Sequence, residues 1–384
     1  MTSRLFGSME TTIFTVMSAL ARTHGAINLG QGFPDEDGPL VLRERAARAL
    51  AEGPNQYPPM AGLPELRAAI AAHSERFYGL KLNPDTDVLV TSGATEAIAD
   101  CLFGLVNPGD EVIVFEPVYD SYRPMIELAG AKAIPVRLEP PNWRLSFETL
   151  ERVVTSRTRV LLLNSPMNPC GKVFDEEELR GLADFCVRND LVAVCDEVYE
   201  HLVFADARHI PLRCLPGMAE RAVRIGSAGK TFALTGWKVG YVSGPAQLIA
   251  PIAKAHQFVT FTTAPALQVA VAEGLGFPDS YFNGLTVDLQ AKRDLLADGL
   301  TRVGFEVLPA AGSYFLIASY APFHLSETPL ALCRRLTIEA GVAAIPLDAF
   351  YGDGHVGPYL RFCFCKRPEI LEQAVARLER YLRR

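Results

Sequence analysis

The sequence predicts an α/β protein with a large domain built on a mostly parallel sheet, plus a smaller α+β domain. Three observations support this fold class. The chain has 384 residues, which is too long for one small core. From about residue 65 to residue 242, short apolar runs alternate with helix-like segments, as in a parallel sheet covered by helices on both faces. The C-terminal third changes to charged amphipathic segments with two strand-like runs.

The individual elements follow from this pattern in chain order. We expect strands at residues 88–91, 111–115, 160–163, 191–195 and 221–225, because each is a short, mostly apolar run. The helix-like segments between them are residues 95–106, 119–129 and 176–188. In the smaller domain we expect helices at 288–303 and 368–384 and strands at 312–317 and 359–364.

The N-terminal 21 residues allow two interpretations. Arg4 followed by an apolar stretch loosely resembles a signal peptide. However, Ile13, Met17 and Leu20 recur at helical spacing, and Glu10 stands directly before the apolar part. These features favour a short amphipathic helix.

Composition and charge exclude several classes of protein. The chain is 49% hydrophobic and 21% charged, which is typical of a well-packed globular protein and not of a disordered one. Its net charge is −7 and it has no basic stripe, so we expect no nucleic-acid partner. No apolar run reaches the length of a membrane span, so we expect no membrane partner.

The eight cysteines include no CxxC pair, and such scattered cysteines fit a reducing compartment, so we expect a cytoplasmic protein. Cys363 and Cys365 alternate within a strand-like run, which puts both side chains on one face. There they are expected to pack and not to bind a metal. We therefore expect no metal site.

Polar residues follow the predicted strands at the points where the strands end. They are Ser92-Gly93, the segment 164–168, Asp196 and the segment 227–230. In open parallel sheets, ligands bind beyond the carboxyl ends of the strands. This edge of the sheet is therefore the expected site.

Residues 226–241, Gly-Ser-Ala-Gly-Lys-Thr-Phe-Ala-Leu-Thr-Gly-Trp-Lys-Val-Gly-Tyr, place Lys230 after an apolar strand and small residues. A lysine nucleophile must lose its proton, and desolvation or a nearby cation such as Lys238 favours that loss. The small residues let an anion approach the backbone, and Ser227 and Lys238 could hold a phosphate. Taken alone, this stretch is only suggestive, because a lysine after a Gly-rich turn is more often a surface lysine.

This stretch resembles the lysine motif of class I aminotransferases, the fold-type I pyridoxal-phosphate enzymes. It is most similar to the group of kynurenine aminotransferases, glutamine transaminase K and methionine aminotransferases. The resemblance spans nearly the whole chain and implies an aspartate aminotransferase-like fold with a seven-stranded sheet. It implies an N-terminal segment (1–40) joined to the small domain, a large domain (41–285) and a small domain (286–384). It also implies pyridoxal 5′-phosphate as cofactor, bound to Lys230 as a Schiff base.

Two positions depart from the pattern of many relatives, which carry Ser in place of Gly229 and Arg in place of Lys238. A lysine is a point charge and an arginine is a planar fork, so phosphate binding is expected to be less directional here.

The resemblance gives cofactor-binding roles to further residues. Asn168, in Asn-Ser-Pro-Met-Asn-Pro-Cys-Gly (164–171), and Tyr199, in Asp-Glu-Val-Tyr (196–199), would hydrogen-bond the phenolic oxygen. Asp196 would face the pyridine nitrogen and keep it protonated. Tyr119, in Glu-Pro-Val-Tyr (116–119), would stack on the ring. The alternatives are a Pro/Asn-rich turn at 164–171, a helix N-cap at Asp196 and a core tyrosine at Tyr119.

Gly93, Ala94 and Thr95 lie in Thr-Ser-Gly-Ala-Thr-Glu (91–96), at a strand-to-helix junction. Exposed backbone N–H groups and the helix dipole suit a phosphate there. Helix capping by Ser92 and Thr95 would also explain these residues.

Other positions are implied to bind substrate or to act across an interface. Arg361 would bind the substrate α-carboxylate in a bidentate manner, unless it only forms a structural salt bridge. The backbone N–H near Gly32, in Gly-Gln-Gly-Phe-Pro (30–34), would touch the same carboxylate, beside Asn168. Tyr57 would contact the cofactor phosphate of a neighbouring subunit, which implies a homodimer with shared active sites; its alternative is a Pro-rich surface loop.

The side-chain pocket is expected to be aromatic. The segment His-Gln-Phe-Val-Thr-Phe-Thr-Thr-Ala-Pro (256–265) matches the place where dicarboxylate-specific relatives carry a second arginine, and it contains none. Phe261 and Phe14 would form apolar walls, unless both are only core packing. This pocket favours neutral donors such as methionine, phenylalanine, kynurenine or glutamine over aspartate.

The resemblance implies a transaminase in which freed Lys230 moves the Cα proton, assisted by Asp196 and Tyr199. Three other functions were considered, and the first two remain open. The first is β-elimination from cysteine conjugates on the same cofactor. The second is N-succinyldiaminopimelate aminotransferase activity, since residues 30–39 and 55–59 also look like stretches of those enzymes; a cation, from a loop such as that of Arg22, would then reach the pocket. The third is an aminotransferase-like transcription regulator, which we do not expect because the pattern begins by Gly30.

Overall fold

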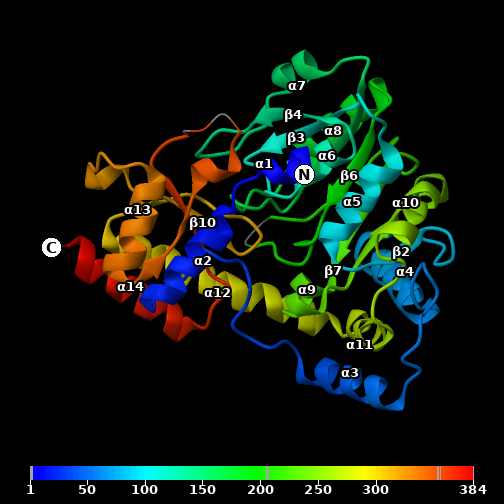
Figure 1. The fold of residues 1–384 in the computed structure, drawn as a ribbon, viewed down its shortest axis with the longest axis horizontal. Coiled ribbons are helices and arrows are strands. Elements are labelled where there is room, and N and C mark those ends of the chain that lie inside the picture. Colours follow the sequence, from blue (N-terminus) through cyan, green and yellow to red (C-terminus); the bar gives the residue numbers. More distant parts are fainter. Residues whose placement is uncertain (1–2, 205–206, 353, 355, 384) are drawn as a thin grey trace.

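The computed structural model describes residues 3–204, 207–352, 354 and 356–383. A seven-stranded sheet forms its larger part, with the strand order β2-β8-β7-β6-β5-β3-β4 (Figure 1). All strands run parallel except β8, which is antiparallel to both neighbours. The strands are β2 (Val88–Thr91), β3 (Glu111–Glu116), β4 (Lys132–Arg137), β5 (Thr158–Asn164), β6 (Val192–Asp196), β7 (Ala222–Ser227) and β8 (Gly240–Ser243). The expected mostly parallel, seven-stranded sheet is confirmed.

Helices cover this sheet. Strands β2, β3 and β7 are buried along their whole length, with no alternation of buried and exposed positions, because both faces are packed. The helices of this part are α3 (Leu40–Glu52), α4 (Pro64–Tyr78), α5 (Ala94–Leu105), α6 (Tyr122–Leu128), α7 (Phe147–Val153), α8 (Glu176–Arg188), α9 (Ala228–Thr231), α10 (Ala246–Val259) and α11 (Pro265–Leu275). Short 3₁₀ turns are η1 (Leu212–Cys214) and η2 (Thr235–Trp237).

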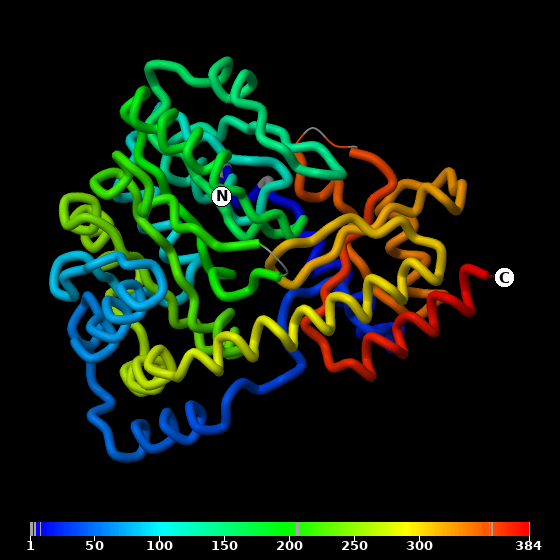
Figure 2. Tube along the Cα trace, turned by 180° about the vertical axis from the view of Figure 1, so that it is seen from behind, coloured from blue at the N-terminus to red at the C-terminus, as the bar shows by residue number. Residues whose placement is uncertain are grey.

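The smaller part contains a second sheet, ordered β12-β13-β10-β9, and a two-stranded pair of β1 with β11. These strands are β1 (Ile27–Asn28), β9 (Glu306–Val307), β10 (Phe315–Ser319), β11 (Val342–Ala343), β12 (Ile345–Pro346) and β13 (Tyr359–Cys363). Its helices are α12 (Asp279–Val303), α13 (Pro329–Arg335), α14 (Pro368–Leu382), the 3₁₀ turns η3 (Ala321–Phe323) and η5 (Leu347–Phe350), and the π-helical turn η4 (Leu336–Ala340). Figure 2 shows α12 running from the larger part into the smaller one.

The N-terminal segment belongs spatially with the C-terminal residues, because β1 pairs in parallel with β11. It begins with α1 (Arg4–Ser8) and α2 (Ile13–His24), and the latter is the amphipathic helix expected from the spacing of apolar residues. The domain boundaries at residues 40 and 285 stay predictions, and the second lies inside α12. No helix within the described residues is long and apolar enough to cross a membrane.

Several elements differ from the sequence predictions. Strand β4 was missed because Pro135 and its partly exposed pattern do not resemble a core strand. Strand β8 was missed because it is only four residues long and lies within the glycine-rich motif. Helix α6 begins at Tyr122, three positions later than predicted, because the preceding residues form an irregular turn at the pocket. Helix α12 begins at Asp279, well before the predicted start at residue 288.

The two neighbouring cysteines of the C-terminal strand-like run pack on one face, as their alternation predicted. The sulfurs of Cys363 and Cys365 lie 3.2 Å apart, and both side chains are buried. All eight cysteines of the chain are free.

Candidate active site

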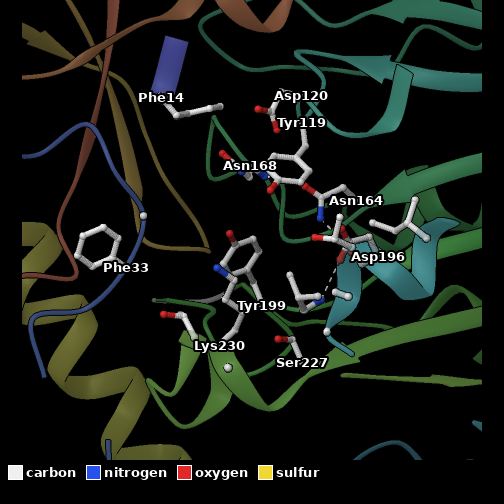
Figure 3. A pocket seen from close by; sticks show the side chains of 18 of the residues that line it. Phe14, Phe33, Tyr119, Asp120, Asn164, Asn168, Asp196, Tyr199, Ser227 and Lys230 are labelled. Carbon is white, nitrogen blue, oxygen red and sulfur yellow. Dashed lines mark hydrogen bonds between the residues drawn. The ribbon is translucent and has the colours of Figure 1, made fainter. Parts of the chain in front are cut away.

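A cavity of about 450 Å³ opens at the carboxyl ends of the parallel strands, where polar residues were expected to gather. Figure 3 shows Lys230 and Ser227 on one side of it and Phe14 and Asp120 on the other. Thirteen of the fifteen predicted site residues line this cavity: Phe14, Gly32, Gly93, Ala94, Thr95, Tyr119, Asn168, Asp196, Tyr199, Ser227, Lys230, Lys238 and Arg361. Its walls come from the N-terminal segment, the large sheet and strand β13.

Lys230 lies in the short helix α9, directly after strand β7. The strand leads into this turn through Gly226, where a Cβ atom would lie 2.2 Å from the ring of Tyr241, so that only glycine fits. The Nζ atom of Lys230 donates a hydrogen bond to the hydroxyl of Tyr314 at 2.8 Å. That hydroxyl in turn donates to the carbonyl of Gly32 at 2.7 Å.

Burial lowers the pKa of Lys230 below its ordinary value. The lowered pKa favours the neutral amine, which is the nucleophilic form. Lys230 therefore has the environment that a reactive lysine needs, and it is not a solvated surface lysine.

Asp196 ends strand β6 and is buried. Tyr122 donates a hydrogen bond to its Oδ2 atom at 2.5 Å, and the N–H of Val198 donates to Oδ1 at 3.3 Å. Burial raises the pKa of Asp196 to about 6, although the Tyr122 bond opposes this shift. No helix begins at Asp196, so the N-cap explanation does not apply. The buried carboxylate can accept a proton, or a hydrogen bond from an N–H group, of a ligand in the cavity.

An anion cradle lies at the N-terminus of helix α5. The N-cap residue is Gly93, with a φ of 83°, and no side chain caps the helix there. A Cβ atom at Gly93 would lie 3.1 Å from Cε and 3.3 Å from Nζ of Lys238, so this ammonium stands directly over the turn. Uncapped N–H groups, the ammonium of Lys238 and the hydroxyl of Ser227 together suit a phosphate.

Arg361 on strand β13 is 1% exposed, and its donors are only partly used. One Nη atom donates to Oδ1 of Asn168 at 2.9 Å and the other to the carbonyl of Gly30 at 2.5 Å, while Nε has no partner. Burial lowers the pKa of Arg361 to about 10. Among the described residues no carboxylate forms an ion pair with it, so the structural salt bridge considered above is not found. A buried guanidinium that has no ion-pair contact within the described part of the chain fits a carboxylate ligand.

The substrate end of the cavity is aromatic but also acidic. The rings of Phe14 and Phe315 lie 5.0 and 4.1 Å from the guanidinium carbon of Arg361. Asp120, which was not predicted from the sequence, also lines the cavity (Figure 3). Burial raises the pKa of Asp120 above its ordinary value, and the charge of Arg361 partly opposes this.

Two predicted residues, Tyr57 and Phe261, do not line the cavity of their own chain. Their rings are 5.5 Å apart, and the two residues are 83% and 38% exposed. Phe258, which is 85% exposed, lies on the same segment as Phe261. Phe261 is therefore not a core residue, and the wall expected from it is missing from the cavity of the single chain.

Several residues of the site were missed from the sequence. Asp120 and Tyr122 follow strand β3 closely, so their position after a strand was an available signal. Asn164 ends strand β5, within the segment 164–168 that was expected at this edge, but no role was predicted for it. Tyr314 comes from the segment before β10, and nothing in the sequence pairs it with Lys230. Arg22 is wrong as a source of a pocket cation, because it lies in the last turn of helix α2, is exposed and does not line the cavity.

The donor set fits pyridoxal phosphate, the cofactor that the resemblance implies. Lys230 supplies an amine for the aldehyde, Asp196 a buried carboxylate for the pyridine nitrogen, and the Gly93 turn with Lys238 a cradle for the phosphate. Tyr119 and Tyr199 present rings and hydroxyls to the space between these groups.

Comparisons with known proteins agree with this geometry. The family model described as "Aminotransferase class I and II" matches residues 24–378. A probable N-succinyldiaminopimelate aminotransferase of Mycobacterium tuberculosis is 47% identical over 380 residues, covering 96% of this chain and 95% of that protein. The methionine aminotransferase of Escherichia coli K12 is 42% identical over 370 residues, covering 96% of both. The solved structure of N-succinyldiaminopimelate aminotransferase from M. tuberculosis superposes with a TM-score of 0.96 at 46% identity, covering 99% of each chain.

Proposed function

The chain belongs to the class I and II aminotransferase family, and from this premise we propose that it takes amino groups from neutral amino acids and passes them to a 2-oxo acid. The protein is an aminotransferase with the aspartate aminotransferase-like fold, and it uses pyridoxal phosphate. The proposal concerns the donor, for which we favour methionine, phenylalanine, kynurenine or glutamine. It rests on the substrate end of the cavity, which combines one guanidinium with aromatic rings and a carboxylate.

When bound, pyridoxal phosphate supplies the carbonyl that accepts the amino group and the electron sink that acidifies the substrate Cα–H. Arg361 binds the α-carboxylate through N–H groups that have no acceptor among the described residues, and thereby orients the substrate. Lys230 Nζ takes up the Cα proton and later returns it on the way to the 2-oxo acid. The hydroxyl of Tyr314, fixed by its bond to Gly32, holds the freed amine in the cavity.

Asp120 provides a physical reason for discrimination against acidic donors. A second carboxylate on the substrate would enter a cavity that Asp120 and Phe14 also line. Among the described lining residues, the cations are Lys230, Lys238 and Arg361, and each already has a role. A distal carboxylate without a cation in a partly dry pocket is strongly disfavoured.

We therefore expect kcat/KM to be at least about tenfold higher for the best neutral donor than for aspartate, a discrimination of about 1.4 kcal/mol. A panel of amino donors assayed against one 2-oxo acid measures this ratio. Asp120→Asn should lower the ratio of kcat/KM for the neutral donor to kcat/KM for aspartate. Asp37→Asn, at an exposed surface position, should leave this ratio unchanged. Equal or better use of aspartate by the wild-type enzyme would refute the donor assignment.

The alternative donor is N-succinyldiaminopimelate, favoured by the 47% identity to the probable M. tuberculosis enzyme. This substrate carries distal carboxylates and would need a cation that the described lining residues do not provide. A strong preference for it in the same panel would mean that another subunit supplies that cation. Turnover of cysteine conjugates without any 2-oxo acid would instead indicate β-elimination.

We propose that the working unit is a homodimer with shared active sites. The exposed aromatic group of Tyr57, Phe258 and Phe261 is typical of an interface, because large exposed apolar surfaces are rarely left uncovered. In this arrangement Tyr57 and Phe261 serve the cavity of the neighbouring subunit. The eight free cysteines support the further proposal that the enzyme works in the reducing cytoplasm.

Tyr57→Phe is expected to weaken cofactor retention about tenfold, because it removes one hydroxyl bond to a charged phosphate. Cofactor content after extensive dialysis measures retention, and light scattering at the assay concentration measures the assembly. Tyr381→Phe, whose hydroxyl bonds Arg335 far along the chain, serves as the matched control. A fully active monomer would contradict the dimer proposal.

A further inference from the structure

A buried charge cluster lies beneath the phosphate cradle and has no part in the chemistry described so far. It consists of Glu96 and Asp100 on helix α5 and His256 on helix α10. His256 and Asp100 are both 0% exposed. The Nδ1 atom of His256 lies 2.9 Å from Oε1 of Glu96 and 3.5 Å from Oδ2 of Asp100. Neither carboxylate oxygen of Asp100 has a hydrogen-bond partner.

The contacts of His256 define its protonation. Its Nε2 atom lies 3.1 Å from the carbonyl oxygen of Met60, which only accepts, so Nε2 must carry a proton. Nδ1 lies at hydrogen-bond distance from Oε1 of Glu96, a carboxylate whose pKa is lowered, so Nδ1 carries a proton as well. Burial lowers the pKa of His256, but Asp100 and Glu96 outweigh burial and raise that pKa to about 9. The ring is thus an imidazolium at neutral pH.

Glu96 connects this cluster to the cradle. Its second oxygen, Oε2, accepts a hydrogen bond from the backbone N–H of Ser92, which opens the turn that leads to Gly93 and Ala94. The carboxylate therefore anchors the turn whose remaining N–H groups face the phosphate. Burial raises the pKa of Glu96, but the bonds from His256, Thr260 and Ser92 lower it below its ordinary value.

An ionised carboxylate in the first turn of a phosphate-binding helix creates an electrostatic conflict. Glu96 is the third residue of helix α5, and its charge would repel a phosphate dianion held at the same helix end. The imidazolium of His256 offsets the charge of Glu96 without removing the bond from Glu96 to Ser92. Burial raises the pKa of Asp100 and thereby favours its uncharged form, so the positive charge of the ring is left mainly to Glu96. We infer that His256 is a positioning residue that neutralises Glu96, so that Glu96 can anchor the phosphate-binding turn without weakening phosphate binding.

The same imidazole also touches the segment that carries Tyr57. Met60, whose carbonyl binds His256, lies three residues after Tyr57, and Gln268 fixes the following stretch by accepting from the N–H of Leu63. In the proposed dimer, His256 connects the phosphate-binding turn of its own subunit to the segment around Tyr57, which serves the active site of the neighbouring subunit. This part alone rests on the proposed dimer; the effect on the subunit's own cradle does not.

The test compares cofactor binding with and without the phosphate group. His256→Gln keeps a donor for Met60 but carries no charge, so the dissociation constant for pyridoxal phosphate should rise at least about tenfold. The dissociation constant for pyridoxal, which lacks the phosphate, should change by less than about threefold, since no dianion meets Glu96. A merely structural role for His256 would weaken the binding of both compounds equally and would overturn the inference.

A double variant separates charge from packing. In Glu96→Gln/His256→Gln the uncompensated carboxylate is gone, so affinity for pyridoxal phosphate should partly recover relative to His256→Gln. Asp100→Asn is the matched control, because it removes a buried carboxyl group one turn further along α5 and keeps the pair of Glu96 with His256. Further loss of affinity in the double variant would contradict the inference. Failure of the wild-type protein to bind either compound would instead contradict the proposed cofactor site.

Two measurements test whether His256 carries a positive charge. With ¹³C-labelled histidine, the signal of His256 should be that of an imidazolium up to about pH 8, and the wild-type advantage in cofactor affinity over His256→Gln should fade as the pH rises through about 9. The titratable groups that face the ring are Glu96 and Asp100 on α5, whereas the segment around Met60 contributes only a carbonyl. A neutral ring at pH 7, or a stoichiometric metal ion bound at this cluster, would overturn the inference.

Discussion

Replacing Lys230 with alanine is expected to lower the rate of transamination by at least about 10⁴-fold, because the variant lacks the one amine among the described lining residues that is placed to move the Cα proton. The amine is held between the hydroxyl of Tyr314 and the ring of Tyr199, and its lowered pKa provides the neutral form. No other described lysine that lines the cavity can replace it, since Lys238 stands over the Gly93 turn. Turnover under single- and multiple-turnover conditions measures the loss.

The control for this variant is Lys81→Ala, at an exposed lysine whose carboxylate partner Glu75 lies 4.0 Å away, which should retain full activity. Lys230→Ala should still bind cofactor through the phosphate cradle and Asp196. In the wild-type protein, borohydride reduction followed by mass spectrometry should locate the cofactor on Lys230. Full turnover by Lys230→Ala would remove the basis of the mechanism.

Replacing Asp196 with asparagine is expected to lower kcat by about 10²- to 10³-fold, as typically follows the loss of one electrostatic contact to the reacting group. Asparagine has the same size and can still accept the hydrogen bond from Tyr122, so the fold should be retained. What it cannot do is keep a pyridine nitrogen protonated. Tyr122→Phe is the matched control, because it keeps the carboxyl group of Asp196 and removes only the hydroxyl that bonds to it.

The raised pKa of Asp196 also gives this residue a pH signature. In the absence of cofactor its pKa is about 6 because of burial, and the ionised form is the one that pairs with a protonated pyridine. Cofactor affinity should therefore be fully present above about pH 6 and decline as the pH falls below it, while Asp196→Asn should lack this decline. An unchanged pH profile in the variant would assign the decline to another group.

The parts of the fold that depend on local pattern could be predicted from the sequence. Helix α8 begins and ends as expected because Asp175 and Glu178 form a capping box at its start. The strands that are buried on both faces were visible as apolar runs. Strand β4 was not, because Pro135 and its partly exposed residues reflect its place at the edge of the sheet.

The residues of the site also differ in whether a local sequence pattern places them. Lys230, Asp196 and the Gly93 turn follow strands directly, so their chain position places them in the cavity. Tyr314 could not be predicted, because it meets Lys230 only after the smaller part has packed against the larger one. His256 resembled an ordinary helical residue, since its two carboxylate partners lie 156 or more positions earlier in the chain. Pairs of this kind depend on tertiary packing, which no local pattern reports.

The bonds that close the cavity also determine when it can form during synthesis. The carbonyl of Gly30 is held by Arg361, and that of Phe33 by Lys366, so each bond joins residues more than 330 positions apart. At about 5–20 residues per second, a ribosome needs roughly 15–70 s to make the intervening chain. During this time the loop around Gly30, one wall of the active site, lacks the two cations that later hold its carbonyls. The substrate site therefore cannot be complete before the chain has been synthesised through Lys366.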